Sequence, residues 1–317
     1  MKMSEKTLPN KVNIWEVLPR DGFQMESKWI PTEEKIRIIR NLASTGIKHI
    51  EVTSFVHPRA IPQLKDAEEV VARVKDLEDI QFRALVPNLR GAQRAIDSGI
   101  NKIKLLLSAT DSHSLSNSNC LVSEAQEGLL PIVELAASKG VRVGGSITVA
   151  FGCPYEGKVP LEKIISIVEH YQELGVTDIS LADTVGMGNP KQVSKMLSVL
   201  KEKFPLFKFS LHLHNTRGMA LANAVAALHQ GVTDFDSSTA GLGGCPYAPN
   251  AAGNIPTEDL IHAFHEMGVD TGIDLDKILE VAKDVKQTIG HDGGSFLLQA
   301  GPNYKLSAKP KGQTKLV

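Results

Sequence analysis

The sequence predicts an α/β protein built as a closed (β/α)₈ TIM barrel with a C-terminal helical extension. Short β-branched apolar runs alternate with longer amphipathic runs along most of the 317 residues. Eight such strand and helix pairs in about 250 residues fit a barrel better than an open sheet. No G-x-G-x-x-G follows the first strand, which removes the main signal of a dinucleotide-binding fold.

The strands are expected, in chain order, at Asn13–Leu18, His49–Thr53, Gln81–Val86, Lys102–Leu107, Arg142–Val149, Asp178–Leu181, Lys208–His214 and Thr233–Ser237. Helical patterns lie between them at Thr32–Ser44, Leu64–Lys75, Leu89–Ser98, Ser123–Lys139, Pro160–Leu174, Pro190–Phe204 and Met219–Gln230. Two more helices, Thr257–Met267 and Leu275–Ile289, form the predicted extension. A glycine follows five of these runs, where a left-handed helix end is expected.

The pattern indicates one folded domain with a tail at each end. We expect an N-terminal tail over residues 1–12, the catalytic barrel with its C-terminal helices over 13–290, and a C-terminal tail over 291–317. The last residues carry several lysines and no acid, which predicts a solvated segment or, alternatively, a partner-binding one.

Composition excludes several classes of function. Lys and Arg number 35 against 36 Asp and Glu, and this balance argues against a protein that binds nucleic acid or acidic membrane surfaces. No apolar stretch approaches the roughly 18 residues of a membrane span. The three cysteines, Cys120, Cys153 and Cys245, are too few for a disulfide scaffold, so we expect reduced thiols in a cytoplasmic protein.

Active sites of barrels lie at the C-terminal ends of the strands, and these ends are rich in polar residues here. The residues are Arg20 and Asp21 after strand one, Glu51 in strand two, Asp183 after strand six, and His212 and His214 in strand seven. The two-residue repeat of a strand aims both histidines to the same side. An H-x-H pair alone is a weak sign of a metal site, since two polar residues on one strand face are common.

The surroundings of the histidine pair favour a metal site. Asp21 can reach the same opening, and Asn254, just past the last strand, can add a carbonyl oxygen. Two imidazoles, a carboxylate and an amide oxygen suit Mg²⁺ or Mn²⁺ better than zinc. Arg20 then either stabilises an oxyanion or forms a structural ion pair with Asp21.

Three glycines surround Cys245 in the segment 240–247. This composition favours a flexible flap that carries a reactive thiol, with a tight turn and an incidental cysteine as the alternative. Cys120 and Cys153 lack such surroundings, so we expect both to be structural.

Several motifs in the same order resemble the 3-hydroxy-3-methylglutaryl-CoA lyases, which belong to a group of metal-dependent barrels that make or break Claisen-type bonds. The resemblance runs from Val12 to Ile289. It rests on VLPRDGFQ (17–24), IEVTSFVHP (50–58), ALVPN (84–88), FGCPYEG (151–157), LADTVG (181–186), HLHNTRGMALAN (212–223) and GLGGCPYAPNAAGNIPTED (241–259). The cysteine loop is the most lyase-specific of these motifs.

The resemblance implies cleavage of an acyl-CoA thioester, 3-hydroxy-3-methylglutaryl-CoA, into acetyl-CoA and acetoacetate. It implies metal ligation by Asp21, His212, His214 and Asn254, with Mg²⁺ or Mn²⁺ as the cofactor. It places Arg20 on the thioester oxygen of the developing enolate, and implies catalytic parts for Glu51, Asp183, His212, Cys245 and Glu258. We also expect a homo-oligomer, a dimer or a tetramer.

The sequence departs from the family pattern at two places. Lyases commonly read L-Q-N-E where Phe23, Gln24, Met25 and Glu26 stand here, and Asp where Asn215 follows the second histidine. We expect these departures to alter the pocket or the metal surroundings, which leaves the exact acyl-CoA open. A condensing synthase of the 2-isopropylmalate or homocitrate type and a non-catalytic barrel that serves as an interaction protein are the alternatives.

Overall fold

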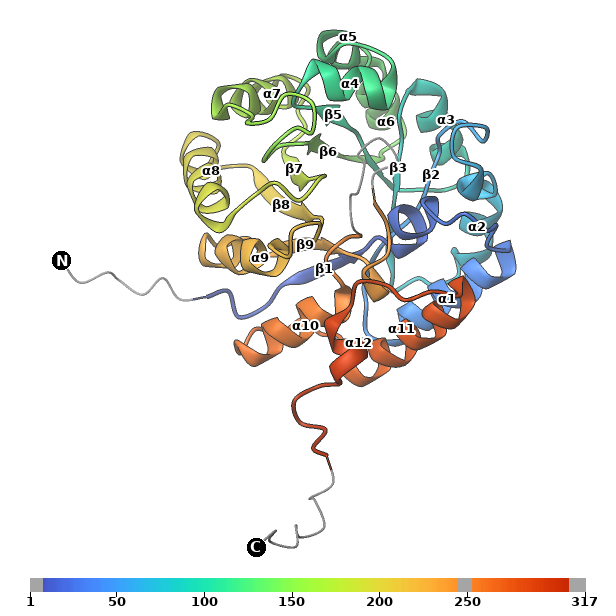
Figure 1. Ribbon diagram of the computed structural model, residues 1–317. Helices are drawn as coiled ribbons and strands as arrows, with labels where there is room; N and C mark the ends of the chain where they lie inside the picture. Colours follow the sequence, from blue (N-terminus) through green and yellow to red (C-terminus); the bar gives the residue numbers. More distant parts are fainter. Residues whose placement is uncertain (1–7, 245–252, 308–317) are drawn as a thin grey trace, which may run out of the picture.

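A closed barrel of parallel strands forms the centre of the protein, and helices surround it (Figure 1). The computed structural model describes residues 8–244 and 253–307. The strands are β1 (Asn13–Glu16), β2 (His49–Ser54), β3 (Gln81–Leu85), β4 (Lys102–Lys104), β5 (Leu107–Ser108), β6 (Arg142–Thr148), β7 (Asp178–Asp183), β8 (Lys208–Leu213) and β9 (Asp234–Ser237). β1 pairs with β9, and β4 and β5 both pair with β6, so β4 and β5 share one of eight places in the ring. The predicted (β/α)₈ barrel is confirmed.

The helices are α1 (Thr32–Ser44), α2 (Ala67–Val74), α3 (Leu89–Asp97), α4 (Asp111–Ser118), α5 (Val122–Glu127), α6 (Leu130–Ser138), α7 (Leu161–Glu173), α8 (Pro190–Lys203), α9 (Ala220–His229), α10 (Thr257–Glu266), α11 (Leu275–Ile289) and α12 (Phe296–Ala300). The helices surround the barrel (Figure 1). Most of them bury apolar residues, whereas α4 buries only His113 and Ser114 and α5 buries none. Within the described residues, none is both long and apolar enough to cross a membrane.

Three local predictions need correction. The first strand ends at Glu16, because Leu18–Gly22 forms a π-helical turn that places Arg20 and Asp21. The helix expected over Ser123–Lys139 is divided into α5 and α6, and Gly128 ends the first part. α4 was not predicted, because its polar sequence DSHSLSNS shows no helical apolar repeat.

Part of the segment predicted to be a C-terminal tail is folded. α12 lies within residues 291–317, and the carboxylate of Asp259 holds its first turn. That carboxylate accepts hydrogen bonds from Ser295 Oγ and from the backbone N–H groups of Phe296 and Leu297, each at 2.9 Å. α12 has only 5 residues, too few to show an apolar repeat of helical period, so the sequence pattern could not reveal it.

The interior of the barrel is filled with charged and polar side chains. Strand residues alternate, so Ile50 and Ile103 pack beneath the helices while Glu51 and Lys104 point to the interior. Lys104 of β4 lies 2.7 Å from Asp236 of β9, and these strands are not neighbours, so the ion pair crosses the interior. Branched apolar residues usually fill this space in barrels.

Two buried carboxylates hold the turn that follows β9. Glu16 accepts hydrogen bonds from Thr239 and Thr257, and Glu258 accepts one from the backbone N–H of Ala240 at 3.1 Å. Ala240 has a φ of 62°, a conformation that non-glycine residues rarely adopt. The buried carboxylates therefore stabilise the strained backbone that leads towards residues 245–252.

Glu258 should make the stability of the protein depend on pH. Burial raises its pKa from 4.5 to about 8. The folded state therefore keeps a proton that the unfolded state loses, and this contribution to stability is lost as pH rises from about 4.5 through about 8. Glu258→Gln should flatten the fall in Tm across this range.

Thermal unfolding followed by circular dichroism at several pH values measures this difference. Glu266→Gln, at an exposed position of the same helix, is the control and should follow the wild-type curve. Parallel curves for Glu258→Gln and wild type would show that Glu258 does not hold the extra proton.

Candidate active site

A cavity of about 480 Å³ lies at the C-terminal ends of the strands. Arg20 and Asp21 line it from the turn after β1, and His212 and His214 line it from the end of β8. Thr148 at the end of β6 contributes to the opposite part of the wall. The cavity therefore occupies the face that carries the active site in barrel enzymes.

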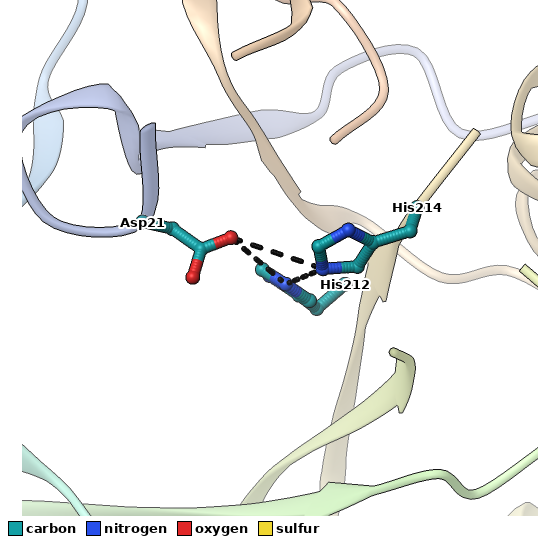
Figure 2. Close-up of side chains that lie close together, drawn as sticks. All are labelled: Asp21, His212 and His214. Carbon is teal, nitrogen blue, oxygen red and sulfur yellow. Dashed lines mark hydrogen bonds and ion pairs between the residues drawn. The ribbon is translucent and has the colours of Figure 1, made fainter. Parts of the chain in front are cut away.

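Asp21, His212 and His214 bring three potential ligand atoms together (Figure 2). The Nε2 atoms of the histidines are 3.1 Å apart, and Asp21 Oδ2 lies 3.7 Å from the first and 3.8 Å from the second. Two imidazole nitrogens at this distance cannot both carry a proton towards each other, so at least one offers a lone pair. All three residues are buried, and the cluster has the donor set of a divalent metal site.

Asn254 completes this donor set. An isolated β-bridge holds it beside His214. Its Nδ2 donates to Asp21 Oδ2 at 2.6 Å and to the carbonyl oxygen of Leu242 at 3.0 Å. Its Oδ1 is buried and has no hydrogen-bond partner among the described residues. A buried oxygen without a partner costs free energy unless a bound ligand contacts it. A buried carbonyl oxygen beside two imidazoles and a carboxylate fits a hard divalent cation.

Arg20 lies between Asp21 and Glu51. Its Nη1 donates to Asp21 Oδ1, and its Nε donates to Glu51 Oε1 at 2.5 Å. Burial opposes ionisation of Asp21, but Arg20 and the two histidines lower the pKa of its carboxyl below the usual value. Asp21 is therefore ionised at neutral pH, as a metal ligand must be. No hydrogen bond within the described part of the chain uses Arg20 Nη2, so this donor is available to a ligand in the cavity.

Glu51 does not reach the cavity wall but joins a buried network of charges. Its second oxygen, Oε2, accepts a hydrogen bond from Arg83 Nε at 2.5 Å and lies 3.8 Å from Lys104 Nζ. Burial opposes ionisation, but Arg20, Arg83 and Lys104 hold the pKa of the Glu51 carboxyl far below its usual range. Glu51 is thus a poor proton acceptor, and its position suits it to orient Arg20.

Sequence reasoning missed Asp236, which contacts a predicted metal ligand. Asp236 Oδ2 lies 3.2 Å from His212 Nδ1, and Oδ1 accepts a hydrogen bond from Arg83 Nη2 at 2.8 Å. A carboxylate on Nδ1 favours the tautomer that leaves Nε2 free for a metal. The alternation in Asp234-Phe235-Asp236 could have identified an inward-facing acid, but not its partner across the barrel.

His113 is a second residue that sequence reasoning missed. It lines the cavity from α4, and its Nδ1 lies 2.9 Å from Ser108 Oγ. Burial lowers its pKa to about 4, so the ring is neutral at pH 7. Its Nε2 has no hydrogen-bond partner in residues 8–244 and 253–307 and can meet a polar group of a bound ligand.

Asp183 and Glu258, both predicted to be catalytic, do not line the cavity. The carboxylate of Asp183 accepts hydrogen bonds from the backbone N–H groups of Met187 and Gly188, at 2.8 and 3.0 Å, and burial raises its pKa to about 6. Glu258 lies beneath the turn at Ala240. Both residues contact backbone groups of nearby loops. Cys245 lies outside the described residues, and the adjacent Gly244 lines the cavity.

The departures from the family pattern lie away from the cavity wall. Phe23 is fully buried in the hydrophobic core, and Met25 is partly exposed on the surface. The side chain of Asn215 accepts a hydrogen bond from the backbone N–H of Ala220 at the start of α9, and an aspartate could accept the same bond. The side chain of Asn215 therefore contacts the start of α9, and its effect on the metal surroundings stays a prediction. Gln24, which matches the family pattern, lines the cavity, with Nε2 2.9 Å from Asp21 Oδ1.

Known proteins match the chain over most of its length. A family model described as HMGL-like matches residues 11–285. The hydroxymethylglutaryl-CoA lyase YngG of Bacillus subtilis is 43% identical over 282 residues, covering 89% of this chain and 94% of the relative. The human mitochondrial hydroxymethylglutaryl-CoA lyase is 39% identical over 294 residues, covering 93% of this chain and 90% of the relative.

Solved structures agree with these relatives. An HMG-CoA lyase from Acinetobacter baumannii, in complex with coenzyme A and 3-methylmalate, matches with a TM-score of 0.92 and 41% identity. The match covers 98% of this chain and all of that chain. The carboxyl transferase domain of Rhizobium etli pyruvate carboxylase, at 15% identity, shares the fold alone. Since the family model spans most of the chain and the lyases match nearly their full length, the chain belongs to the HMGL-like family, that of the 3-hydroxy-3-methylglutaryl-CoA lyases.

Proposed function

We propose that this protein cleaves 3-hydroxy-3-methylglutaryl-CoA into acetyl-CoA and acetoacetate, and that the reaction depends on Mg²⁺ or Mn²⁺. The observation that carries the proposal is the cluster of Asp21, His212 and His214, which faces the cavity in a chain of the lyase family. Relatives named as lyases and the retained donor set favour lyase activity over a condensing synthase or a non-catalytic barrel.

Asp21, His212, His214 and Asn254 would hold the metal ion. When bound, the ion supplies a positive charge that binds the substrate hydroxyl and carboxylate and makes the hydroxyl more acidic. Asp236 keeps the His212 ring in place, and the β-bridge between His214 and Asn254 keeps those two residues side by side.

Arg20 would stabilise the charge that develops during cleavage. As a base takes the proton of the hydroxyl, the bond between C2 and C3 breaks, C3 becomes the ketone of acetoacetate, and the electron pair moves into the thioester as an enolate. The enolate then takes a proton at C2. Arg20 lines the cavity and is held by Asp21 and Glu51, so it can offer a fixed positive charge to the enolate oxygen without reorganisation.

The remaining residues have supporting parts in this proposal. Glu51 orients Arg20, Asp183 holds the backbone at Met187 and Gly188, and Glu258 holds the turn at Ala240. The resemblance implies a catalytic part for Cys245, and its thiol can help to protonate the enolate carbon or relay its proton. A cytoplasmic location, which the small number of cysteines favours, and assembly into a dimer or tetramer stay predictions.

An assay of the purified protein tests the proposed reaction. Release of acetyl-CoA should be followed with Mg²⁺ present for 3-hydroxy-3-methylglutaryl-CoA and for analogues with longer C3 substituents. We expect turnover of the methyl substrate, since the departures at Phe23 and Met25 lie away from the cavity. Condensation without cleavage, or no turnover of any thioester, would contradict the proposal.

Removal of divalent metal should abolish activity. The donor set of two imidazoles, a carboxylate and an amide oxygen holds hard ions exchangeably, so EDTA should strip the site and Mg²⁺ or Mn²⁺ should restore turnover. The Tm of the stripped protein should rise on addition of Mn²⁺. Full activity in excess EDTA, with no metal found by elemental analysis, would be incompatible with this mechanism.

Replacement of Arg20 should slow turnover more than it weakens metal binding. Loss of one partner of a developing oxyanion typically lowers kcat by about 10²–10³-fold, so Arg20→Gln should show a loss of this size. Arg20→Lys, which keeps the charge but loses the planar fork, should retain more activity. Steady-state kinetics at saturating Mn²⁺, with metal content measured beside them, give the comparison. A kcat within a few-fold of wild type for Arg20→Gln would make Arg20 structural.

A further inference from the structure

Arg83 of β3 contacts two carboxylates that serve different sides of the active site. We propose that Arg83 is a positioning residue for the reaction, one that fixes His212 through Asp236 and Arg20 through Glu51. The inference rests on the proposed metal-dependent function. It adds a residue that does not line the cavity and that the lyase resemblance does not assign.

The guanidinium of Arg83 spans the barrel interior. Its Nε donates to Glu51 Oε2 of β2 at 2.5 Å, and its Nη2 donates to Asp236 Oδ1 of β9 at 2.8 Å. β2 and β9 are not neighbours in the sheet, because β1 lies between them. Below, Arg83 Cζ lies 4.2 Å from the centre of the Trp15 ring. A planar group with two used donors and a ring beneath it has little freedom to move.

Each carboxylate connects Arg83 to the cluster of Asp21, His212 and His214. The other oxygen of Asp236 contacts His212 Nδ1, and the other oxygen of Glu51 accepts from Arg20 Nε. Arg20 in turn donates to Asp21, which lies beside His212 Nε2. The contacts form a closed ring that starts and ends at the ligand cluster, and Arg83 lies farthest from it. A displaced Arg83 would therefore disturb both His212, through Asp236, and Arg20, through Glu51.

The charges of the ring balance when Lys104, which contacts both Glu51 and Asp236, is included, and this makes a conservative substitution at Arg83 informative. Arg20, Arg83 and Lys104 face Asp21, Glu51 and Asp236, so three cations meet three anions. Arg83→Lys keeps this balance, but one ammonium group cannot reproduce two donors in a fixed fork. Its effect therefore reports geometry rather than net charge.

The first experiment compares Arg83→Lys with wild type. Metal-free proteins are titrated with Mn²⁺ by calorimetry, and kcat and KM are measured at saturating Mn²⁺. Loss of such supporting contacts typically costs about 10–100-fold in metal affinity or activity, and we expect a loss in this range for both Mn²⁺ affinity and kcat. KM should change little, because the cavity wall is unaltered. Unchanged Mn²⁺ affinity and kcat in a folded variant would overturn the proposal.

A pair of charge-neutral double variants guards against a folding defect in Arg83→Lys. Arg83→Gln with Asp236→Asn removes one cation and one anion of the ring and should bind Mn²⁺ more weakly. Lys102→Gln with Asp178→Asn removes a partly exposed ion pair of 2.7 Å whose cation also lies over Trp15. This control pair should leave Mn²⁺ affinity and kcat near wild type. Equal losses in both double variants would overturn the proposal, since loss of an ion pair outside the ring would then have the same effect.

The two proposals fail in different ways. If wild type binds Mn²⁺ but does not cleave 3-hydroxy-3-methylglutaryl-CoA, the substrate assignment fails, while a weaker Mn²⁺ affinity of Arg83→Lys still supports the role of Arg83. If wild type cleaves the thioester and Arg83→Lys matches it in both readouts, only the role of Arg83 fails. Absence of Mn²⁺ binding to wild type would overturn both.

Discussion

Glu51 and Asp236 lie inside the barrel with Arg83 and Lys104 between them, in a space from which water is largely excluded. Charges in such a place are weakly screened, so each depends on its partners for solvation. The ligand cluster is attached to this network at two points, through Asp236 to His212 and through Arg20 to Asp21. The side chains of Asp21 and His212 are therefore held by contacts that continue into the buried network.

Filling the interior of a barrel with charged residues carries a large desolvation free energy. Apolar residues of similar volume often give equal or greater stability than a buried ion pair, whereas removal of one partner typically destabilises by about 3–5 kcal/mol. Here the apolar contacts lie between the strands and the helices, where residues such as Ile38, Ile39 and Leu42 are fully buried. The outer layer thus stabilises the fold, and the interior can be specialised for holding a site in fixed geometry.

The alternating strand and helix periods made the barrel predictable, because each strand must bury an apolar face against the helices. The H-x-H pattern likewise identified His212 and His214. The same two-residue period also explains why the side chains of Asp183 and Asn215 do not line the cavity. Ala182 is in register with His212, so Ala182 shares the inward face, whereas Asp183 points away from it. Asn215 follows His214 directly and turns towards α9.

Contacts across the barrel could not be predicted in this way. The alternation in Gln81-Phe82-Arg83 indicates that Arg83 shares a face with Gln81, but it does not identify Asp236, 153 positions along the chain, as a partner. Closure of the sheet brings these residues together, and their distance depends on strand register that a single sequence does not reveal. α12 was not predicted for a related reason, because its first turn is held by Asp259 of α10, which lies far away in the sequence.

The central claim is that Asp21, His212, His214 and Asn254 together bind one divalent cation. A crystal soaked in Mn²⁺, with anomalous diffraction measured at a wavelength where manganese scatters strongly, tests it directly. The account predicts one strong anomalous peak within coordination distance of Asp21 Oδ2, both histidine Nε2 atoms and Asn254 Oδ1. A fully loaded crystal with the manganese peak elsewhere, or a cluster that stays empty while the protein is active, would contradict it.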